Sequence, residues 1–248
     1  MKLSITIPVY NEDEILEACV KKLNLFLKKK KYDYEIIIAD NASTDKTPEI
    51  SKRICRKYKK VKYVRLEQKG RGRALKKAWN SSNADILCYT DADLATGLEA
   101  LPKLVNAIRN NYDIAVGSRL VKGAIVKRSF SREILSRGYN FMLRKILRIH
   151  FKDAQCGFKA INRKILRKIL PKAEDNEWFF DTEILFLAEK AGFKIKEIPV
   201  RWIEEGTIKK SKKTEKKNKK SVRKSKVKLL KTILNYLNSV NRLRKREK

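Results

Sequence analysis

Short apolar runs alternate with amphipathic stretches over the first half of the chain. β-Branched residues are frequent in the runs at 3–9, 34–40, 61–66, 84–90 and 114–117, as is typical of buried strands. Between these runs, apolar residues recur with helical spacing at about 15–27, 43–58, 71–82 and 98–110. The alternation predicts an α/β fold with a central, mainly parallel sheet flanked by helices on both faces.

The pattern is looser after residue 119. It predicts a basic helix near 128–148, a turn-like segment at 153–159, helices near 163–170 and 179–191, and a strand over 194–202. Residues 209–226 are mostly Lys, Ser, Thr and Asn, a composition typical of a solvated linker. A helical spacing returns over 227–243, with one apolar face made of Leu230, Ile233, Leu234, Leu237 and Val240. We therefore predict one domain over 1–208 and a Lys-rich linker with a basic amphipathic helix over 209–248.

The charge of the chain predicts a polyanionic partner. Sixty-one Lys and Arg against 28 Asp and Glu give a net charge of +33, and residues 209–248 alone hold 18 Lys or Arg and 2 Glu. Nucleic acid, nucleotide phosphates and an anionic membrane all fit such a charge. The last helix suits a membrane surface, or docking onto the domain or a partner, and a disordered basic extension is the third interpretation.

Cysteine and histidine usage argues against a structural zinc site. The four cysteines lie tens of residues apart, and His150 is the sole histidine, so reduced intracellular thiols are the better interpretation.

The N-terminus turns polar at Asn11, too early for a signal peptide, and no run approaches the roughly 18 apolar residues of a membrane span. We expect a cytoplasmic protein, soluble or peripherally attached to the cytoplasmic face of a membrane.

Polar residues follow the predicted strands at the points where ligands bind in parallel sheets. They are Tyr10-Asn11-Glu12, Asp40-Asn41, Asp91-Ala92-Asp93 and Ser118-Arg119. Two carboxylates two residues apart offer the oxygen ligands that Mg²⁺ or Mn²⁺ prefers, although an Asp-x-Asp can also simply cap a turn. The segment Lys69-Gly70-Arg71-Gly72-Arg73-Ala74 places glycines and cations before a helix, as phosphate binding requires, but it lacks the context of a dinucleotide fold.

Taken together, these segments resemble the inverting glycosyltransferases of family two with the GT-A fold, in particular the polyprenyl-phosphate (dolichyl-phosphate) sugar synthases. The resemblance covers about residues 3–210. It is carried by Ile7-Pro8-Val9-Tyr10-Asn11-Glu12, Asp40-Asn41-Ala42-Ser43-Thr44-Asp45, Lys69-Gly70-Arg71-Gly72, Asp91-Ala92-Asp93-Leu94-Ala95-Thr96, Gly117-Ser118-Arg119, Asp153-Ala154-Gln155-Cys156-Gly157-Phe158-Lys159 and Phe180-Asp181-Thr182-Glu183.

Within this group the chain looks most similar to the dolichyl-phosphate glucosyltransferases. The segment 153–159, the run Trp178-Phe179-Phe180-Asp181 and the Ala-Thr pair after Asp93 carry this likeness. Mannose-transferring relatives often have Gln, which helps to hold the metal, where this chain has Ala95. The resemblance therefore implies UDP-glucose as the favoured donor, GDP-mannose as the alternative, and a polyprenyl or dolichyl phosphate as the acceptor.

The resemblance also implies roles for individual residues. Donor-binding residues would be Pro8, Tyr10, Glu12, Asp40, Lys69, Asp91 and Asp93, with Asp40 near the nucleobase. Asp91 and Asp93 would bind a divalent metal, Mg²⁺ or Mn²⁺, with Asp93 as the main ligand. The acceptor phosphate would be held by Ser118, Arg119, Arg132 and Ser136. Asp181 and Glu183 would either orient the arginines and the acceptor or act as a base.

Two further functions stay open at this stage. Transfer to a glycan hydroxyl would require Asp181 or Glu183 as an essential base. A basic nucleic-acid-binding protein also fits the charge, but the sequence has no recognition-helix, zinc-finger or aromatic RNA-binding motif, and acidic strand ends would repel a phosphate backbone. We therefore expect no nucleic-acid partner. A catalytically inactive adaptor is disfavoured because both Asp91 and Asp93 are present.

Overall fold

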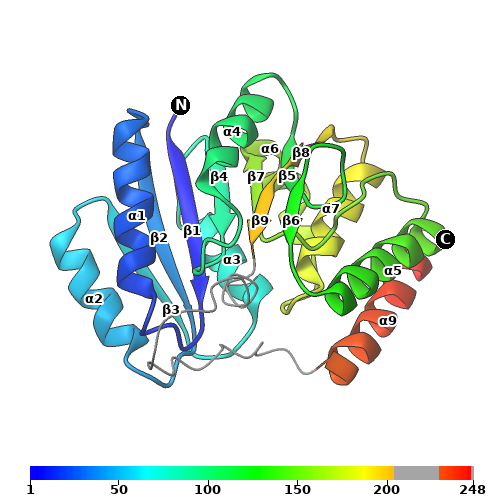
Figure 1. Cartoon of the computed structure of the whole chain (residues 1–248), viewed down its shortest axis with the longest axis horizontal. Coiled ribbons are helices and arrows are strands. Elements are labelled where there is room, and N and C mark those ends of the chain that lie inside the picture. Colours follow the sequence, from blue (N-terminus) through cyan, green and yellow to red (C-terminus); the bar gives the residue numbers. More distant parts are fainter. Residues whose placement is uncertain (204–228, 247–248) are drawn as a thin grey trace, which may run out of the picture.

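The computed structural model describes residues 1–203 and 229–246, and the side chains of 229–234 are outside this description. A seven-stranded sheet with the order β3-β2-β1-β4-β7-β5-β8 forms the centre of the molecule (Figure 1). Its strands are β1 (Leu3–Val9), β2 (Tyr34–Asn41), β3 (Val61–Leu66), β4 (Ile86–Thr90), β5 (Ile114–Ser118), β7 (Phe158–Asn162) and β8 (Ile195–Pro199). β7 is antiparallel to β4 and β5, whereas the other pairings are parallel, so the prediction of a mainly parallel sheet is confirmed.

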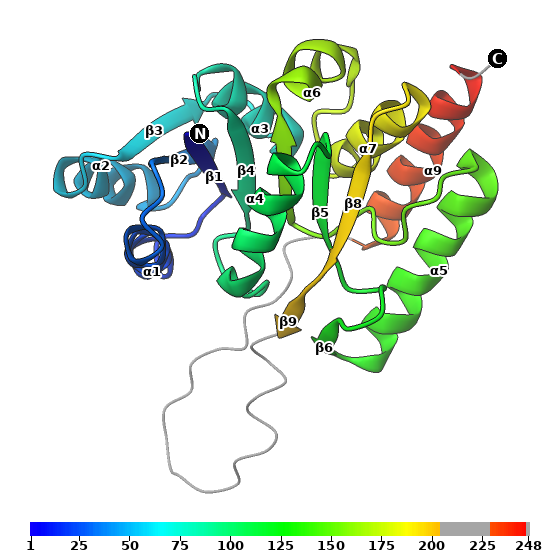
Figure 2. The same ribbon diagram turned by 90° about the horizontal axis from the view of Figure 1, so that it is seen from above.

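Helices cover both faces of this sheet. Viewed from above, α1 and α4 lie on one face and α3 and α6 on the other (Figure 2). The helices of residues 1–203 are α1 (Leu16–Lys29), α2 (Thr47–Lys57), α3 (Arg71–Asn80), α4 (Leu101–Arg109), α5 (Phe130–Leu147), α6 (Arg163–Lys168) and α7 (Phe180–Lys190), with short 3₁₀ turns at Leu98–Ala100 and Leu170–Lys172. Because both faces are covered, the central strands are buried on both sides, and even Ser4 and Thr6 of β1 are fully buried.

The predicted strand over 194–202 is wrong in one respect, because the chain changes sheets at Val200. β8 pairs with β5 in the main sheet, and the following strand β9 (Arg201–Ile203) pairs with β6 (Ile125–Lys127) in a separate two-stranded sheet. The buried Val200 lies at the change of direction. This switch carries β9 from the main sheet towards the loop that follows β4.

The segment 153–159 is also more regular than the sequence suggests. Its last two residues begin β7, which inserts between β4 and β5. The strand is only five residues long, and Lys159 interrupts its apolar pattern. Lys159 is nevertheless 1% exposed, because its ammonium pairs with a buried carboxylate described below.

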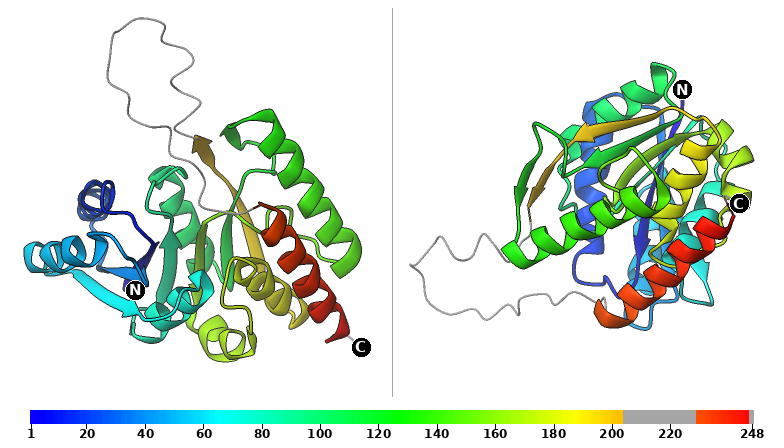
Figure 3. Two further views of the ribbon diagram at one scale, coloured as in Figure 1. Left: turned by 90° about the horizontal axis from the view of Figure 1, so that it is seen from below. Right: turned by 90° about the vertical axis from the view of Figure 1, so that its right-hand side faces the viewer.

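The C-terminal helix α9 (Leu229–Lys245) lies beside α5 (Figure 3). The Tyr236 ring packs at a tilt against Tyr139 of α5 and Phe179 before α7, with ring centroids 5.3 and 5.7 Å apart. Val240 and Leu243 are fully buried. The structure therefore has the docked form of the helix, while the predicted domain boundary at 208/209 and the linker lie outside the described residues.

No helix within 1–203 or 229–246 combines the length and the apolar character that crossing a bilayer requires.

Candidate active site

The carboxyl ends of β1, β2, β4 and β5 lie along one edge of the main sheet, as their parallel directions require. Backbone strain concentrates there. Of the six non-glycine residues with left-handed backbone in the described chain, three follow these strands, namely Asn11 (φ 54°), Ala42 (φ 57°) and Leu94 (φ 49°). Such conformations persist where the surroundings fix them and are frequent at binding sites. The strand-end residues therefore lie along one edge of the sheet, and their convergence on one crevice stays a prediction.

Asp40 lies fully buried at the end of β2. Its carboxylate accepts hydrogen bonds from the hydroxyl of Tyr63 at 2.6 Å, from Nη1 of Arg65 at 3.2 Å and from the backbone N–H of Ser43 at 2.9 Å. A nucleobase would contact this carboxylate directly only if Tyr63 or Arg65 turned away. The geometry therefore gives Asp40 an organising position below the loop after β2.

Tyr10 and Lys69 come together from distant parts of the sequence. The ammonium of Lys69 lies 3.9 Å from the centre of the Tyr10 ring and also donates a hydrogen bond to its hydroxyl. Two residues after Tyr10, the backbone N–H of Glu12 donates to Oγ1 of Thr47 at 2.8 Å. Pro8 lies in β1 opposite Ala39. These donor-binding candidates thus share the edge formed by β1, β2 and the 69–73 loop.

Arg71 connects two carboxylates beneath this edge. At the N-terminus of α3 its guanidinium is almost fully buried, with Nη2 2.7 Å from Oδ1 of Asp91 and Nη1 donating to Oδ2 of Asp181. The Arg71 guanidinium also lies over two aromatic rings. Its Cζ is 5.1 Å from the centre of the Tyr89 ring and 4.9 Å from the centre of the Trp178 ring. Burial opposes the charge of Arg71, but Asp181 and Asp91 outweigh it and hold its pKa well above the usual value.

Asp181 is held by cations rather than open to a substrate. Its other oxygen accepts from Nζ of Lys159 at 2.8 Å and from the hydroxyl of Tyr89. Burial alone would raise the pKa of this carboxyl, but Lys159 and Arg71 lower it below the usual value. A buried carboxylate with a depressed pKa is a poor proton acceptor, so the environment favours an orienting role for Asp181 over a role as a general base.

Asp91 and Asp93 fit a divalent cation. Both carboxylates reach the surface at the end of β4, and hard cations take such oxygen ligands. The loop is shaped around them: Oδ1 of Asp93 accepts from the N–H of Ala95 at 3.0 Å, and a Cβ at Gly157 would lie 1.9 Å from Oδ2 of Asp91. Only glycine permits this approach. Over the described residues, no cluster of three or more His, Cys, Asp or Glu forms a complete protein-only metal site.

Arg119 forms a two-point ion pair with Asp153 at the end of β5. Nε and Nη2 of Arg119 donate to the two carboxylate oxygens at 2.8 Å each, and the Arg119 backbone N–H adds a third bond of 2.9 Å. Burial acts against both charges, but the pairing raises the pKa of Arg119 and lowers that of Asp153. The pair fixes the guanidinium plane, so an incoming phosphate would meet its Nη1 side.

Two of the remaining acceptor candidates, Ser118 and Ser136, are connected to this pair. Ser118 is buried at the end of β5. On α5, the carbonyl of Ser136 accepts from Nδ2 of Asn140, whose Oδ1 accepts from the N–H of Ala154 at 3.0 Å, so the Ser136 turn is tied to the residue after Asp153. The Ser136 hydroxyl is itself buried and has no hydrogen-bond partner among residues 1–203 and 229–246. Arg132 lies one turn earlier on α5 and is exposed.

Strand β9 links the paired aspartates to the arginines. Thr96 forms a bridge with Trp202, and the carbonyl of Ala95 accepts from the N–H of Ile203 at 3.1 Å. The Trp202 ring in turn lies 5.7 Å from Cζ of Arg119 and 5.9 Å from Cζ of Arg128. The loop that carries Asp93 and the arginine that follows β5 therefore share one strand as a support.

Sequence reasoning missed the buried layer of this site. Arg71 is noted above only as one cation of a glycine-containing loop, and no role is given to Tyr89, Lys159 or Trp202. A Lys in the middle of an apolar segment is the signal that could have pointed to Lys159, since an isolated Lys is rarely buried unless it is paired.

Comparisons with known proteins place the chain among glycosyltransferases. The chain is 37% identical over 215 residues to the glycosyltransferase AglD of Haloferax volcanii, which covers 84% of this chain and 34% of that protein. It is 33% identical over 220 residues to the dolichyl-phosphate beta-glucosyltransferase of Drosophila melanogaster, covering 82% of this chain and 68% of that one. The chain thus spans about a third of the first relative and about two thirds of the second.

A solved structure shares the fold. Glucosyl-3-phosphoglycerate synthase from Mycobacterium tuberculosis, in complex with Mn²⁺, uridine diphosphate and glucosyl-3-phosphoglycerate, superposes with a TM-score of 0.69 at 17% identity, covering 98% of this chain and 79% of that chain. This likeness confirms the expected GT-A type of α/β fold. The family model described as glycosyl transferase family 2 matches residues 4–170, and on this match the chain belongs to that family.

Proposed function

We propose that the protein transfers a hexose, with glucose favoured, from a nucleotide-diphosphate sugar to a polyprenyl or dolichyl phosphate. The observation that carries the proposal is the support that β9 gives to both halves of the site, the Asp91–Asp93 loop on one side and Arg119 on the other. An anionic donor and an anionic acceptor need such neighbouring seats. The relatives named as dolichyl-phosphate glucosyltransferases support the choice of acceptor and sugar.

In this proposal the donor lies along the edge formed by β1, β2 and β4. Tyr10, Lys69 and Glu12 contact its nucleoside end, and Asp40 holds the loop beneath them. A divalent ion bound to Asp91 and Asp93 would supply positive charge to the departing diphosphate. Arg71 keeps Asp91 in place, because its buried guanidinium is anchored at the other end by Asp181. The solved structure with Mn²⁺ and uridine diphosphate supports a divalent metal without deciding between Mg²⁺ and Mn²⁺.

The acceptor explains why the site can work without a general base. A phosphate monoester has a second pKa of about 6 and is anionic at neutral pH, so it needs to be positioned rather than deprotonated. Three side chains would hold the phosphate in this position, and together they are called the acceptor seat. They are Arg119, whose guanidinium plane is set by Asp153, and Arg132 and Ser136 on α5. The reaction would then be a single displacement with inversion at the anomeric carbon and no covalent sugar–enzyme intermediate.

Transfer to a glycan hydroxyl is the second candidate, and the two carboxylates that it needs are poorly placed for it. Asp181 is enclosed by Arg71 and Lys159. Glu183 is buried with Oε1 3.4 Å from Arg242 of α9, on the side of α7 that packs against the tail helix. Neither carboxylate is offered to an acceptor in this arrangement, which favours the phosphate acceptor.

The test is a transfer assay with each radiolabelled nucleotide sugar and a polyprenyl phosphate, followed by extraction of the lipid phase. We expect label in the lipid from UDP-glucose and an inverted anomeric configuration by proton NMR. Lipid label from GDP-mannose alone would replace glucose by mannose. Retention of the anomeric configuration would overturn the single displacement. Label that is incorporated into glycan hydroxyls instead of the lipid would overturn the phosphate acceptor.

A further inference from the structure

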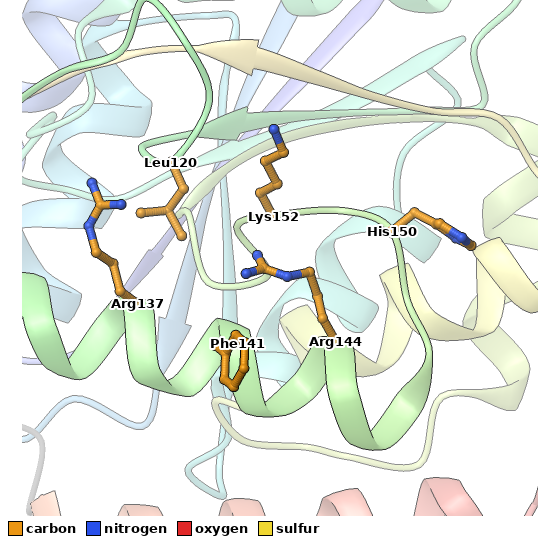
Figure 4. Close-up of a pocket in the computed structure, with 6 residues that line it drawn as sticks. All are labelled: Leu120, Arg137, Phe141, Arg144, His150 and Lys152. Carbon is orange, nitrogen blue, oxygen red and sulfur yellow. The ribbon is translucent and has the colours of Figure 1, made fainter.

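A basic groove lies beside α5, next to the acceptor seat but not part of it. Its volume is about 490 Å³, and Figure 4 shows Arg137 and Arg144 extending from α5 towards the loop after β5 and the segment before Asp153. The lining residues are Leu120, Arg137, Phe141, Arg144, His150 and Lys152. Four of these six side chains are basic.

Two of the cations in this groove are available to an external anion. Arg137 pairs with Glu133 at 2.5 Å, and His150 turns towards Glu189 with Nδ1 3.2 Å from its carboxylate. Arg144 and Lys152, by contrast, make no ion pair with any carboxylate of residues 1–203 and 229–246. An Arg without a carboxylate partner beside the apolar side chains of Leu120 and Phe141 suits a phosphate that is attached to an apolar body.

The outer surface of α5 continues this groove with apolar side chains. Phe130, Ile134 and Phe141 are 78%, 55% and 55% exposed and lie on one side of the helix by its 3.6-residue period. Of the ten large hydrophobic side chains that are exposed in the described chain, five lie on α5. A helix with exposed Phe and Ile beside Arg and Lys is typical of the membrane interface.

We propose that this groove binds the phosphate headgroup of an anionic membrane phospholipid, with Arg144 and Lys152 as its cationic contacts and Phe130 and Phe141 entering the headgroup layer. The membrane contact of this protein is then α5, whereas α9 uses Val240 and Leu243 to dock onto the domain. The inference rests on the proposed function in one respect: Leu120 and Lys152 adjoin Arg119 and Asp153, so contact here turns the acceptor seat towards the bilayer.

A membrane fits this surface better than a nucleic acid. Protein surfaces that bind nucleic acid combine basic residues with aromatic side chains on which bases stack, or with side chains that read base edges in a groove. Here aliphatic Ile134, Leu135 and Ile146 are exposed around the same helix, and they have no counterpart in a phosphate backbone. The aliphatic residues are therefore better explained by acyl chains near a headgroup.

Vesicle co-sedimentation of the full chain tests the proposal. Vesicles of phosphatidylcholine alone are compared with vesicles that also contain phosphatidylglycerol, in the absence of any nucleotide sugar. The double variant Arg144→Gln, Lys152→Gln should bind the anionic vesicles about 30-fold more weakly, since each basic side chain near an anionic bilayer strengthens binding about fivefold. Its matched control is Lys28→Gln, Lys29→Gln, which removes the same charge from α1 at the opposite end of the molecule (Figure 1).

The apolar contribution has its own matched pair. Phe141→Ser should weaken binding to the anionic vesicles, whereas Leu25→Ser, which removes a 57% exposed side chain from α1, should not. All six substituted positions are exposed or partly exposed, so the variants should keep the thermal midpoint of the wild type. Equal binding by the groove variant and the α1 control would overturn the proposal.

Three further readouts separate the groove from other ligands. Displacement from the vesicles by inorganic phosphate at equal phosphate concentration would make it a free-phosphate site, and loss of nucleic-acid binding without loss of vesicle binding would make it a nucleic-acid surface. Transfer to polyprenyl phosphate in neutral detergent should keep its KM in the groove variant. A raised KM there would assign the groove to the acceptor instead. Because vesicle binding needs no sugar transfer, it succeeds or fails independently of the proposed reaction.

Discussion

Asp91 at the end of β4 receives a hydrogen bond of 2.7 Å from Nη2 of Arg71, a guanidinium that is itself almost fully buried. The contact couples a candidate metal ligand at the surface to a layer of charges below the sheet edge. Because Arg71 is also bound to the buried Asp181, the position of Asp91 depends on residues below the surface. Arg71 is thus a positioning residue.

Replacing Arg71 by Lys tests this coupling. An ammonium keeps the charge but cannot reach both carboxylates with two parallel donors, so Asp91 loses its fixed orientation. We expect kcat to fall about 10²-fold with a much smaller change in the acceptor KM, because a displacement of about 1 Å in a reacting group has an effect of that order. Steady-state kinetics with saturating metal measures it. A kcat within twofold of the wild type would leave Arg71 with a purely structural role.

Asp93→Ala tests the metal site. Asp93 is exposed, so its removal should leave the fold intact, while the charge that the ion supplies to the leaving diphosphate is worth several kcal/mol. We expect transfer to fall by about 10³-fold or more, together with weaker Mn²⁺ binding in the presence of uridine diphosphate. Asp33→Ala, at an exposed turn before β2, is the matched control. Turnover near that of the control would remove the metal role from Asp93.

The surface of the site followed from the sequence, since strand ends can be located from apolar periodicity alone. Tyr10, Asp40, Asp91 and Ser118 each directly follow or end a β-branched run, and parallel strands bring such ends to one edge. That inference needs no knowledge of which strands are neighbours. It therefore does not depend on the strand order.

The buried layer could not be predicted in the same way. β7 enters the sheet between β4 and β5 in the antiparallel direction, and a five-residue strand with a Lys inside it has no distinctive period. Without β7, nothing places Lys159 beside Asp181. The change of sheet at Val200 has no signal in the sequence either. β8 and β9 have the same strand-like composition although they pair with different strands.

The docking of α9 predicts an effect on stability that depends on which face of the helix is altered. Leu243 is fully buried and Leu237 is 39% exposed on the same helix. Leu243→Ala should lower the free energy of unfolding by about 2–5 kcal/mol, because a cavity is left in a packed contact. Leu237→Ala should change it by no more than about 0.5 kcal/mol. Urea unfolding of the two variants measures the difference, and equal effects would contradict the docked arrangement.

The ion pair of Arg119 and Asp153 predicts how stability responds to acid. Burial would raise the pKa of Asp153, but Arg119 outweighs it, so the folded-state pKa lies below that of the unfolded chain, which is about 3.9. The pair therefore contributes its full stabilisation above about pH 4 and loses it as the pH falls through the folded-state value. Acid should weaken the fold through this carboxylate.

Asp153→Asn isolates that contribution. At neutral pH the variant leaves a buried guanidinium without its carboxylate and should lose about 3–5 kcal/mol. Below about pH 4, however, its free energy of unfolding should depend less steeply on pH, by up to about 1.4 kcal/mol per pH unit, because one proton-linked group is gone. Asp33→Asn should keep the wild-type slope, since an exposed carboxylate gains little from folding. Urea unfolding in steps from about pH 5 to pH 2 decides. If Asp153→Asn shows the same slope as the wild type, then the carboxylate that pairs with Arg119 is not a source of the acid sensitivity of the fold.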